Sequence, residues 1–175
     1  MNIFVTDSDP YKSAIVLPDK HICKMPVECC QMLSIVCSEK WGHGFGELHR
    51  QDGEPYKTDK GAFRNHPCTV WASSFVMNWQ WLLHHGLALC DEYKARYDKE
   101  HTCRKTLEEA QVILPSGDPT GRSGKGPTPF VRAMPDEYKL DTNISTFDAY
   151  KMYIASKPWV RDNYVRIPDR KPDWV

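Results

Sequence analysis

The sequence predicts a mainly α-helical protein, a compact single-domain helical bundle with a short extended arm at its N-terminus. Apolar residues recur with helical spacing along the longest segments of the chain. Several of those segments open with residues typical of helix starts. The length of 175 residues suits one ordinary domain, and a hydrophobic fraction of 41% is that of a globular protein. We therefore expect one domain over residues 1–175, with loop insertions at about 40–60 and 115–129.

The first part of the chain predicts an arm followed by two helices. Residues 2–5 are apolar and β-favouring, but they are too few for more than an edge strand or an extended arm. Asp9 followed by Pro10 is typical of a helix start, because aspartate accepts from free amides and proline is tolerated at the first helical position. A second helix is expected from Asp19. Pro26 removes a hydrogen bond within it, so we expect a kink there rather than two separate helices.

The rest of the chain predicts three more helices and two loops. Residues 40–60 are rich in glycine, histidine and charge, which indicates a loop. Pro67 opens the longest helical pattern, expected to be one helix at the buried centre of the domain. Another helix is predicted over residues 102–114, and residues 115–129 have the composition of a flexible surface loop. A last helix begins near Ser145, where Ser-x-x-Asp resembles a capping box.

Composition and charge exclude several classes of protein. The formal net charge is zero, so no whole-molecule field would attract nucleic acid or an anionic membrane. The seven cysteines include no Cys-x-x-Cys pair and are expected to be reduced, packed thiols. There is no signal peptide and no apolar run of about 18 residues, so we expect a cytoplasmic location. We assign no metal or cofactor. Neither of the histidine pairs that could be metal ligands, His43 with His49 and His84 with His85, has the spacing of a known metal site.

A polar stripe on the second predicted helix is the most informative feature. His21, Lys24 and Glu28 are spaced by three and four residues, and Gln31 follows three residues later. This spacing places them on one side of a helix that begins at Asp19. An imidazole, an ammonium, a carboxylate and an amide on one stripe can supply a general acid or base with partners that tune it. Such a stripe is also what the solvated face of any amphipathic helix shows.

A second cluster stands where a loop enters the long predicted helix. Arg64, Asn65 and His66 precede Pro67, and Trp71 follows one turn later. Free amides and the helix dipole bind anions at a helix N-terminus, and an arginine adds a fixed charge for a phosphate. The alternative is that Asn65 or His66 caps the helix and that Trp71 belongs to the core.

The glycine-rich segment over residues 121–128 invites comparison with a phosphate-binding loop. The motif requires glycine where Pro119 stands, and serine or threonine where Gly126 stands. We therefore reject a phosphate-loop function for this segment.

The two clusters belong to a longer ordered set of residues. The set comprises Leu17-x-Asp19-Lys20-His21, Lys24, Glu28, Arg64-Asn65-His66-Pro67, Trp71, Leu87-Ala88-Leu89-Cys90-Asp91-Glu92, Ile167-Pro168-Asp169, Pro172 and Trp174. It resembles uncharacterised phage and bacterial proteins that look like distant relatives of the pyrimidine dimer DNA glycosylases, the family of the phage endonuclease V. The resemblance leaves out residues 40–60 and the glycine-rich loop.

The resemblance implies a compact all-helical enzyme that attacks the sugar C1′ with the chain's own N-terminal amine and forms an imine. A helix glutamate assists base release and the later strand cleavage. Carried over, Glu28 would be the catalytic carboxylate, with His21 and Asp19 beside it and the amine of Met1 or Asn2 as nucleophile. An α-amine suits this task because it has the lowest ordinary pKa of a protein's amines.

The expected function is that of a DNA glycosylase-like enzyme that acts on a damaged or modified base in DNA. A more specific form of this hypothesis adds an abasic-site lyase step, in which the enzyme also cleaves the strand. Substrate and phosphate binding would fall to Lys20, Lys24, Gln31, Arg64, Asn65, His66 and Trp71. One alternative is a nucleotide or modified-base transferase or hydrolase on the same scaffold, which the neutral net charge favours because a nucleotide needs a pocket rather than a long basic groove. The other is a non-catalytic binding protein.

Overall fold

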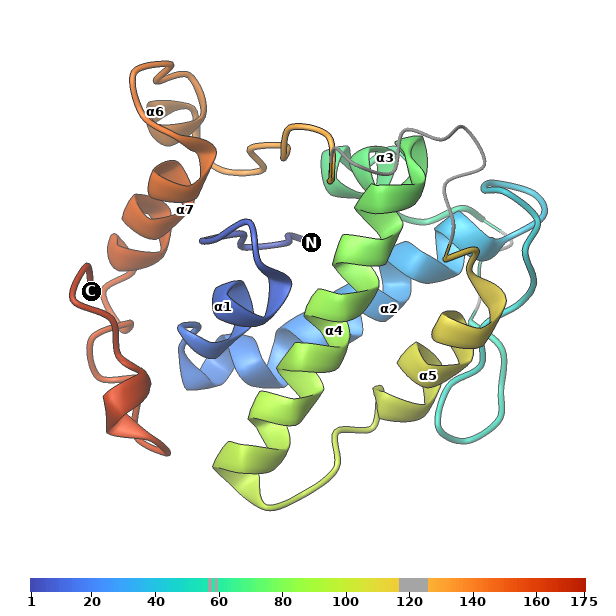
Figure 1. The fold of residues 1–175 in the computed structure, drawn as a ribbon, viewed down its shortest axis with the longest axis horizontal. Helices are drawn as coiled ribbons and strands as arrows, with labels where there is room; N and C mark the ends of the chain where they lie inside the picture. The colour runs from blue at the N-terminus through green and yellow to red at the C-terminus, as the bar shows by residue number, and fades with distance from the viewer. Residues whose placement is uncertain (57, 59, 117–125) are drawn as a thin grey trace.

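The computed structural model describes residues 1–175 except residues 57, 59 and 117–125 (Figure 1). The described part contains α1 (Pro10–Ile15), α2 (Asp19–Cys37), α3 (Pro67–Ser74), α4 (Val76–Tyr97), α5 (Arg104–Ile113), α6 (Asp136–Lys139), α7 (Thr146–Ala155) and the short 3-10 helix η1 (Pro168–Arg170). No strand occurs among these described residues, whose one isolated bridge pairs His49 with Pro55. The prediction of a mainly α-helical fold is confirmed. Residues 2–5 form an arm without regular secondary structure, which is not extended throughout because Phe4 has a φ of 41°.

Helix α4 forms the centre of the bundle. It packs against α1, α2, α3 and α5, and Figure 1 shows it crossing α2, with α5 on one side and α1 on the other. Gly86 permits this close packing, because a Cβ atom there would lie 2.9 Å from Leu107 Cδ2 and 3.2 Å from Cys29 Cβ. The apolar core therefore lies where α2, α4 and α5 meet.

The predicted helix starts are confirmed where a capping residue was identified. The Asp9 carboxylate accepts from the backbone amides of Tyr11 and Lys12 at the start of α1. Ser145 Oγ accepts from the Asp148 amide at the start of α7. Helix α2 runs without interruption through Pro26, as one helix. The predicted loop over residues 115–129 falls mostly on residues 117–125, which lie outside the described part of the chain.

The single long helix predicted after the second polar cluster is wrong, because the structure divides it into α3 and α4. Phe75 separates the two with an extended backbone, φ −157° and ψ 146°. The side-chain amide of Asn78 donates to Trp71 O at 2.7 Å, and its oxygen accepts from the Thr128 amide at 2.9 Å. A side chain thus satisfies a carbonyl that a continuous helix would have satisfied with its own backbone. Apolar spacing continues across the break and gives no sign of it.

The cysteines are free thiols, as expected, and all except Cys23 are buried. Within the described residues, no helix combines the length and the apolar character needed to cross a bilayer.

Candidate active site

The N-terminal arm is held firmly against the rest of the chain. Asn2 is 7% exposed, and its side-chain amide donates to Ala133 O at 2.6 Å. The side-chain oxygen of Asn2 accepts from the amides of Ile3 and Phe4 at 2.8 and 3.1 Å. The Met1 side chain is only 2% exposed, whereas the whole residue is partly accessible. The accessible part of Met1 is therefore mainly its backbone end, which carries the α-amine.

The side chain of Glu28 contacts this end of the chain. The residue lies on α2 and is 6% exposed. Its Oε2 atom accepts from the Asn2 amide at 2.6 Å and lies 3.8 Å from the Met1 amine. Its Oε1 atom lies 3.3 Å from Lys24 Nζ, one helical turn earlier. A nearly buried carboxylate, an α-amine and an ammonium therefore converge.

A cavity of about 410 Å³ opens beside Glu28. This volume falls within the roughly 300–1,000 Å³ typical of small-ligand sites. The N-terminal arm and the first turns of α2 form one side of it, and the segment from the end of α7 to Trp159 forms the other. The cavity can therefore admit a group about the size of a nucleotide to the amine and the carboxylate.

His21 is a neutral ring in the wall of this cavity. It stacks on Phe4, with centroids 4.2 Å apart, and meets Trp159 edge-on at 5.5 Å. Burial, followed by the charges of Lys157 and Lys24, lowers the pKa of His21 to about 3. Its Nδ1 atom is buried without a hydrogen-bond partner among the described residues. His21 therefore offers a hydrogen-bonding ring rather than a positive charge.

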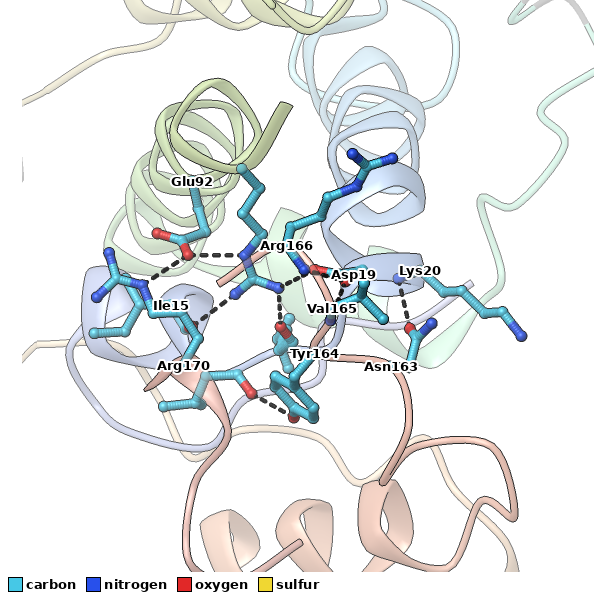
Figure 2. A network of polar contacts seen from close by, with 12 residues as sticks. Ile15, Asp19, Lys20, Glu92, Asn163, Tyr164, Val165, Arg166 and Arg170 are labelled. Carbon is cyan, nitrogen blue, oxygen red and sulfur yellow. Dashed lines mark hydrogen bonds and ion pairs between the residues drawn. The ribbon is translucent and has the colours of Figure 1, made fainter. Parts of the chain in front are cut away.

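Asp19 does not line the cavity and instead anchors the C-terminal part of the chain. Its carboxylate accepts from the amides of Val165 and Arg166 at 2.8 and 3.2 Å, as Figure 2 shows. It also pairs at 2.9 Å with Arg96, whose side chain is fully buried. Arg96 pairs in turn with Glu92 at 2.9 Å. The position of Asp19 at the start of α2 thus fixes the far end of the chain.

The same segment caps the helix that carries Glu28. Helix α2 has no side-chain cap of its own. Asn163 provides one, because its backbone carbonyl accepts from the Asp19 amide and its Oδ1 atom accepts from the Lys20 amide, both at 2.8 Å (Figure 2). Arg170 adds a 2.9 Å contact to Glu92 on α4. The C-terminal segment and α2 therefore hold one another in place.

The second polar cluster is only partly near the amine. His66 caps α3, its Nδ1 atom accepting from the Cys68 amide at 3.2 Å. Burial and then the N-terminal amine lower the pKa of His66, whereas the Glu28 carboxylate raises it. Both charged groups are therefore close enough to His66 to affect its pKa. Arg64 lies over the ring of Trp41 at 4.5 Å, and Asn65 is exposed.

Trp71 and Gln31 lie away from the cavity. Trp71 is 6% exposed and packs against Phe130 and Trp81, with centroids 5.1 and 6.0 Å apart. Its contacts are those of a core residue. Gln31 lines a separate cavity of about 280 Å³, next to Phe63.

Reasoning from the sequence missed the wall that faces α2. Tyr153, Lys157 and Trp159 line the cavity, together with Phe4 from the arm. A basic residue between two aromatic residues is a pattern of nucleic-acid-binding surfaces and could have drawn attention to this segment. Among the described residues, no cluster of three or more His, Cys, Asp or Glu side chains could hold a metal ion.

Comparison with known proteins identifies a family for the chain. No curated protein and no solved structure matches the chain. A family model described as pyrimidine dimer DNA glycosylase matches residues 1–105, a range that includes the N-terminal arm, α2 with Glu28, α3 and α4. The chain therefore belongs to the pyrimidine dimer DNA glycosylase family.

Proposed function

We propose that this protein is a DNA glycosylase that removes a damaged or modified base, with the N-terminal amine as nucleophile and Glu28 as catalytic carboxylate. The observation that carries the proposal is the contact between the chain end and Glu28, at 2.6 Å from the Asn2 amide and 3.8 Å from the Met1 amine. Both groups border a cavity large enough for a nucleotide. Membership of a glycosylase family supports the same function.

The chemistry follows from these two groups. A neutral amine has a lone pair that can attack C1′, and the bond from C1′ to the base breaks as the new C–N bond forms. Glu28 accepts the proton that the amine must lose, because its Oε2 atom already faces the chain end, and the departing base takes up this proton as it leaves. Removal of Met1 would leave the amine on Asn2, whose nitrogen lies 2.6 Å from the same oxygen. Either chain end therefore presents an amine to Glu28.

The proposal extends to strand cleavage. Opening of the sugar ring would turn the C1′ adduct into an imine, which makes the C2′ proton acidic. A base that removes this proton allows the 3′ phosphate to leave by elimination, and Glu28 is the carboxylate beside the cavity. His21 would assist as a neutral hydrogen-bonding ring, and Asp19 would act by positioning α2.

Substrate binding would begin at the rim of the cavity. Lys20 and Lys24 are exposed side chains on the first turns of α2, and both border the cavity. His66 lies near the chain end, and it would meet DNA phosphates together with its sequence neighbours Asn65 and Arg64. Trp71 and Gln31 lie outside this cavity and would contribute less to substrate binding. Trp71 is a core residue, and Gln31 would contact DNA at a greater distance from the reacting nucleotide.

The test is base release from a panel of duplexes that carry ultraviolet photoproducts or other modified bases. Glu28→Gln keeps an oxygen acceptor for the Asn2 amide but loses the base, so we expect the single-turnover rate to fall by about 10²- to 10⁴-fold. Binding of the same duplex should change little. Glu137→Gln is the matched control, because Glu137 is exposed and lies outside the cavity. Equal rates for the Glu28→Gln and Glu137→Gln variants would contradict the proposed role of Glu28.

A further inference from the structure

Lys157 lines the same cavity as Met1 and Glu28. It follows the end of α7, is half-buried and lines the cavity. Its Nζ atom lies 4.1 Å from the centre of the Tyr153 ring and 5.9 Å from that of Phe4. The Lys157 charge is felt inside the cavity, because after burial it is the largest cause of the lowered pKa of His21.

The charges around the cavity do not balance. Glu28 is already engaged with Lys24 and the Met1 amine. Lys157 and Lys20 border the same space, and neither has a carboxylate within ion-pair distance in the part of the chain that the structure describes. The protein as a whole has a net charge of zero, so this excess of positive charge is local. A local excess of cations beside an accessible cavity favours an anionic ligand.

The aromatic rings give Lys157 a defined position without neutralising it. A cation over a ring is attracted by the electrons of its face, yet the ammonium keeps its full charge. The segment that follows is fixed on α2 by Asn163 and on α4 by Arg170. Both features hold the ammonium at the cavity while leaving its hydrogen-bond donors for a ligand.

We propose that Lys157 is a substrate-binding residue that contacts a DNA phosphate beside the reacting nucleotide, with the rings of Tyr153 and Phe4 holding its ammonium in place. This inference rests on the proposed function, since it takes the ligand to be DNA. It also assigns part of the site to a segment that lies beyond residues 1–105, which the family model matches.

The test is the affinity for a duplex that carries a stable tetrahydrofuran abasic analogue, measured by fluorescence anisotropy over a series of salt concentrations. Lys157→Gln should weaken binding by about tenfold or more, as expected for the loss of a charged hydrogen bond. It should also reduce the slope of log affinity against log salt by about 0.9, the value for one phosphate contact. Lys157→Arg keeps the charge and should retain most of the affinity. Lys151→Gln is the matched control, because Lys151 lies on α7 and pairs with Asp148 at 3.2 Å.

Neutral methylphosphonates, placed one at a time beside the abasic analogue, identify the phosphate. One position should weaken binding by the wild type and by the Lys151→Gln variant but have no effect on the Lys157→Gln variant. Equal losses in all three proteins would overturn the Lys157 inference, as would equal affinity of the two glutamine variants. If the wild type bound none of these duplexes and gave no borohydride-stable adduct with duplexes that carry natural abasic, ultraviolet-damaged or modified-base sites, the proposed function itself would fail. Wild-type binding and trapping with no effect of Lys157→Gln would remove the Lys157 inference alone.

Discussion

Arg96 pairs with Asp19 and Glu92, the two carboxylates that contact the C-terminal segment, and its replacement by methionine should destabilise the protein strongly. The guanidinium contacts Asp19 and Glu92, each at 2.9 Å, and the backbone carbonyls of Leu17 and Ile15 at 2.8 and 2.9 Å. The side chains of Arg96, Asp19 and Glu92 are 0%, 9% and 2% exposed. Methionine fills a similar volume but leaves the two carboxylates without their shared cation.

The size of the effect follows from this burial. Removal of one partner from a buried ion pair costs about 3–5 kcal/mol, because an uncompensated charge remains. For a protein of 150–250 residues, each kcal/mol lowers Tm by about 2–4 °C, so the predicted decrease is roughly 6–20 °C. Arg170 still contacts Glu92 at 2.9 Å and the amides of Val165 and Arg166 still reach Asp19, which favours the lower part of this range.

Differential scanning calorimetry at neutral pH measures the change. Arg104→Met is the matched control, because Arg104 pairs with Asp91, which is 56% exposed, and an exposed pair contributes about 0–1 kcal/mol. A Tm of the Arg96→Met variant no lower than that of the Arg104→Met variant would refute the argument that the buried ion pairs of Arg96 stabilise the fold.

Three further predictions concern stability. Gly86→Ala should cost about 1–3 kcal/mol in chemical denaturation, because its Cβ would overlap Leu107; an unchanged midpoint would contradict the close packing of α4. Asn163→Ala should cost about 0.5–2 kcal/mol through loss of the α2 cap, whereas Asn163→Asp should retain most of it; equal losses would argue against capping. Burial lowers the pKa of His21 to about 3 and that of His85 to about 4, from 6.5. Below pH 6.5 the unfolded chain therefore binds protons that the folded protein does not. As the pH decreases from 6.5, the free energy of unfolding should decrease by up to about 1.4 kcal/mol per pH unit for each histidine. Denaturation midpoints that stay constant from pH 6.5 to about 4.5 would contradict this.

Local signals in the sequence predicted the helices well. A capping side chain and the helix it begins are only a few residues apart, as Asp9 and Ser145 show. The break at Phe75 could not be predicted in this way. It depends on Asn78, which is satisfied by Thr128, fifty residues further along the chain.

The same distinction applies to the candidate site. Helical spacing correctly placed His21, Lys24 and Glu28 on one side of α2, and all three line the cavity. Asp19 was expected beside these residues, at the start of the helix, but its partners in the C-terminal segment direct its carboxylate elsewhere. Lys157 is separated from Glu28 by most of the chain, so only the folded protein brings the two to one cavity.

Borohydride trapping tests the central claim most directly. The protein is mixed with duplexes that contain abasic, ultraviolet-damaged or modified-base sites, reduced, digested and analysed by mass spectrometry. The proposed function predicts a covalent adduct on the α-amine of the first residue, Met1 or Asn2 after Met1 removal, because that nitrogen lies beside Glu28. An adduct on a lysine, or no adduct at high protein concentration, would contradict the proposal that the chain's own amine is the nucleophile.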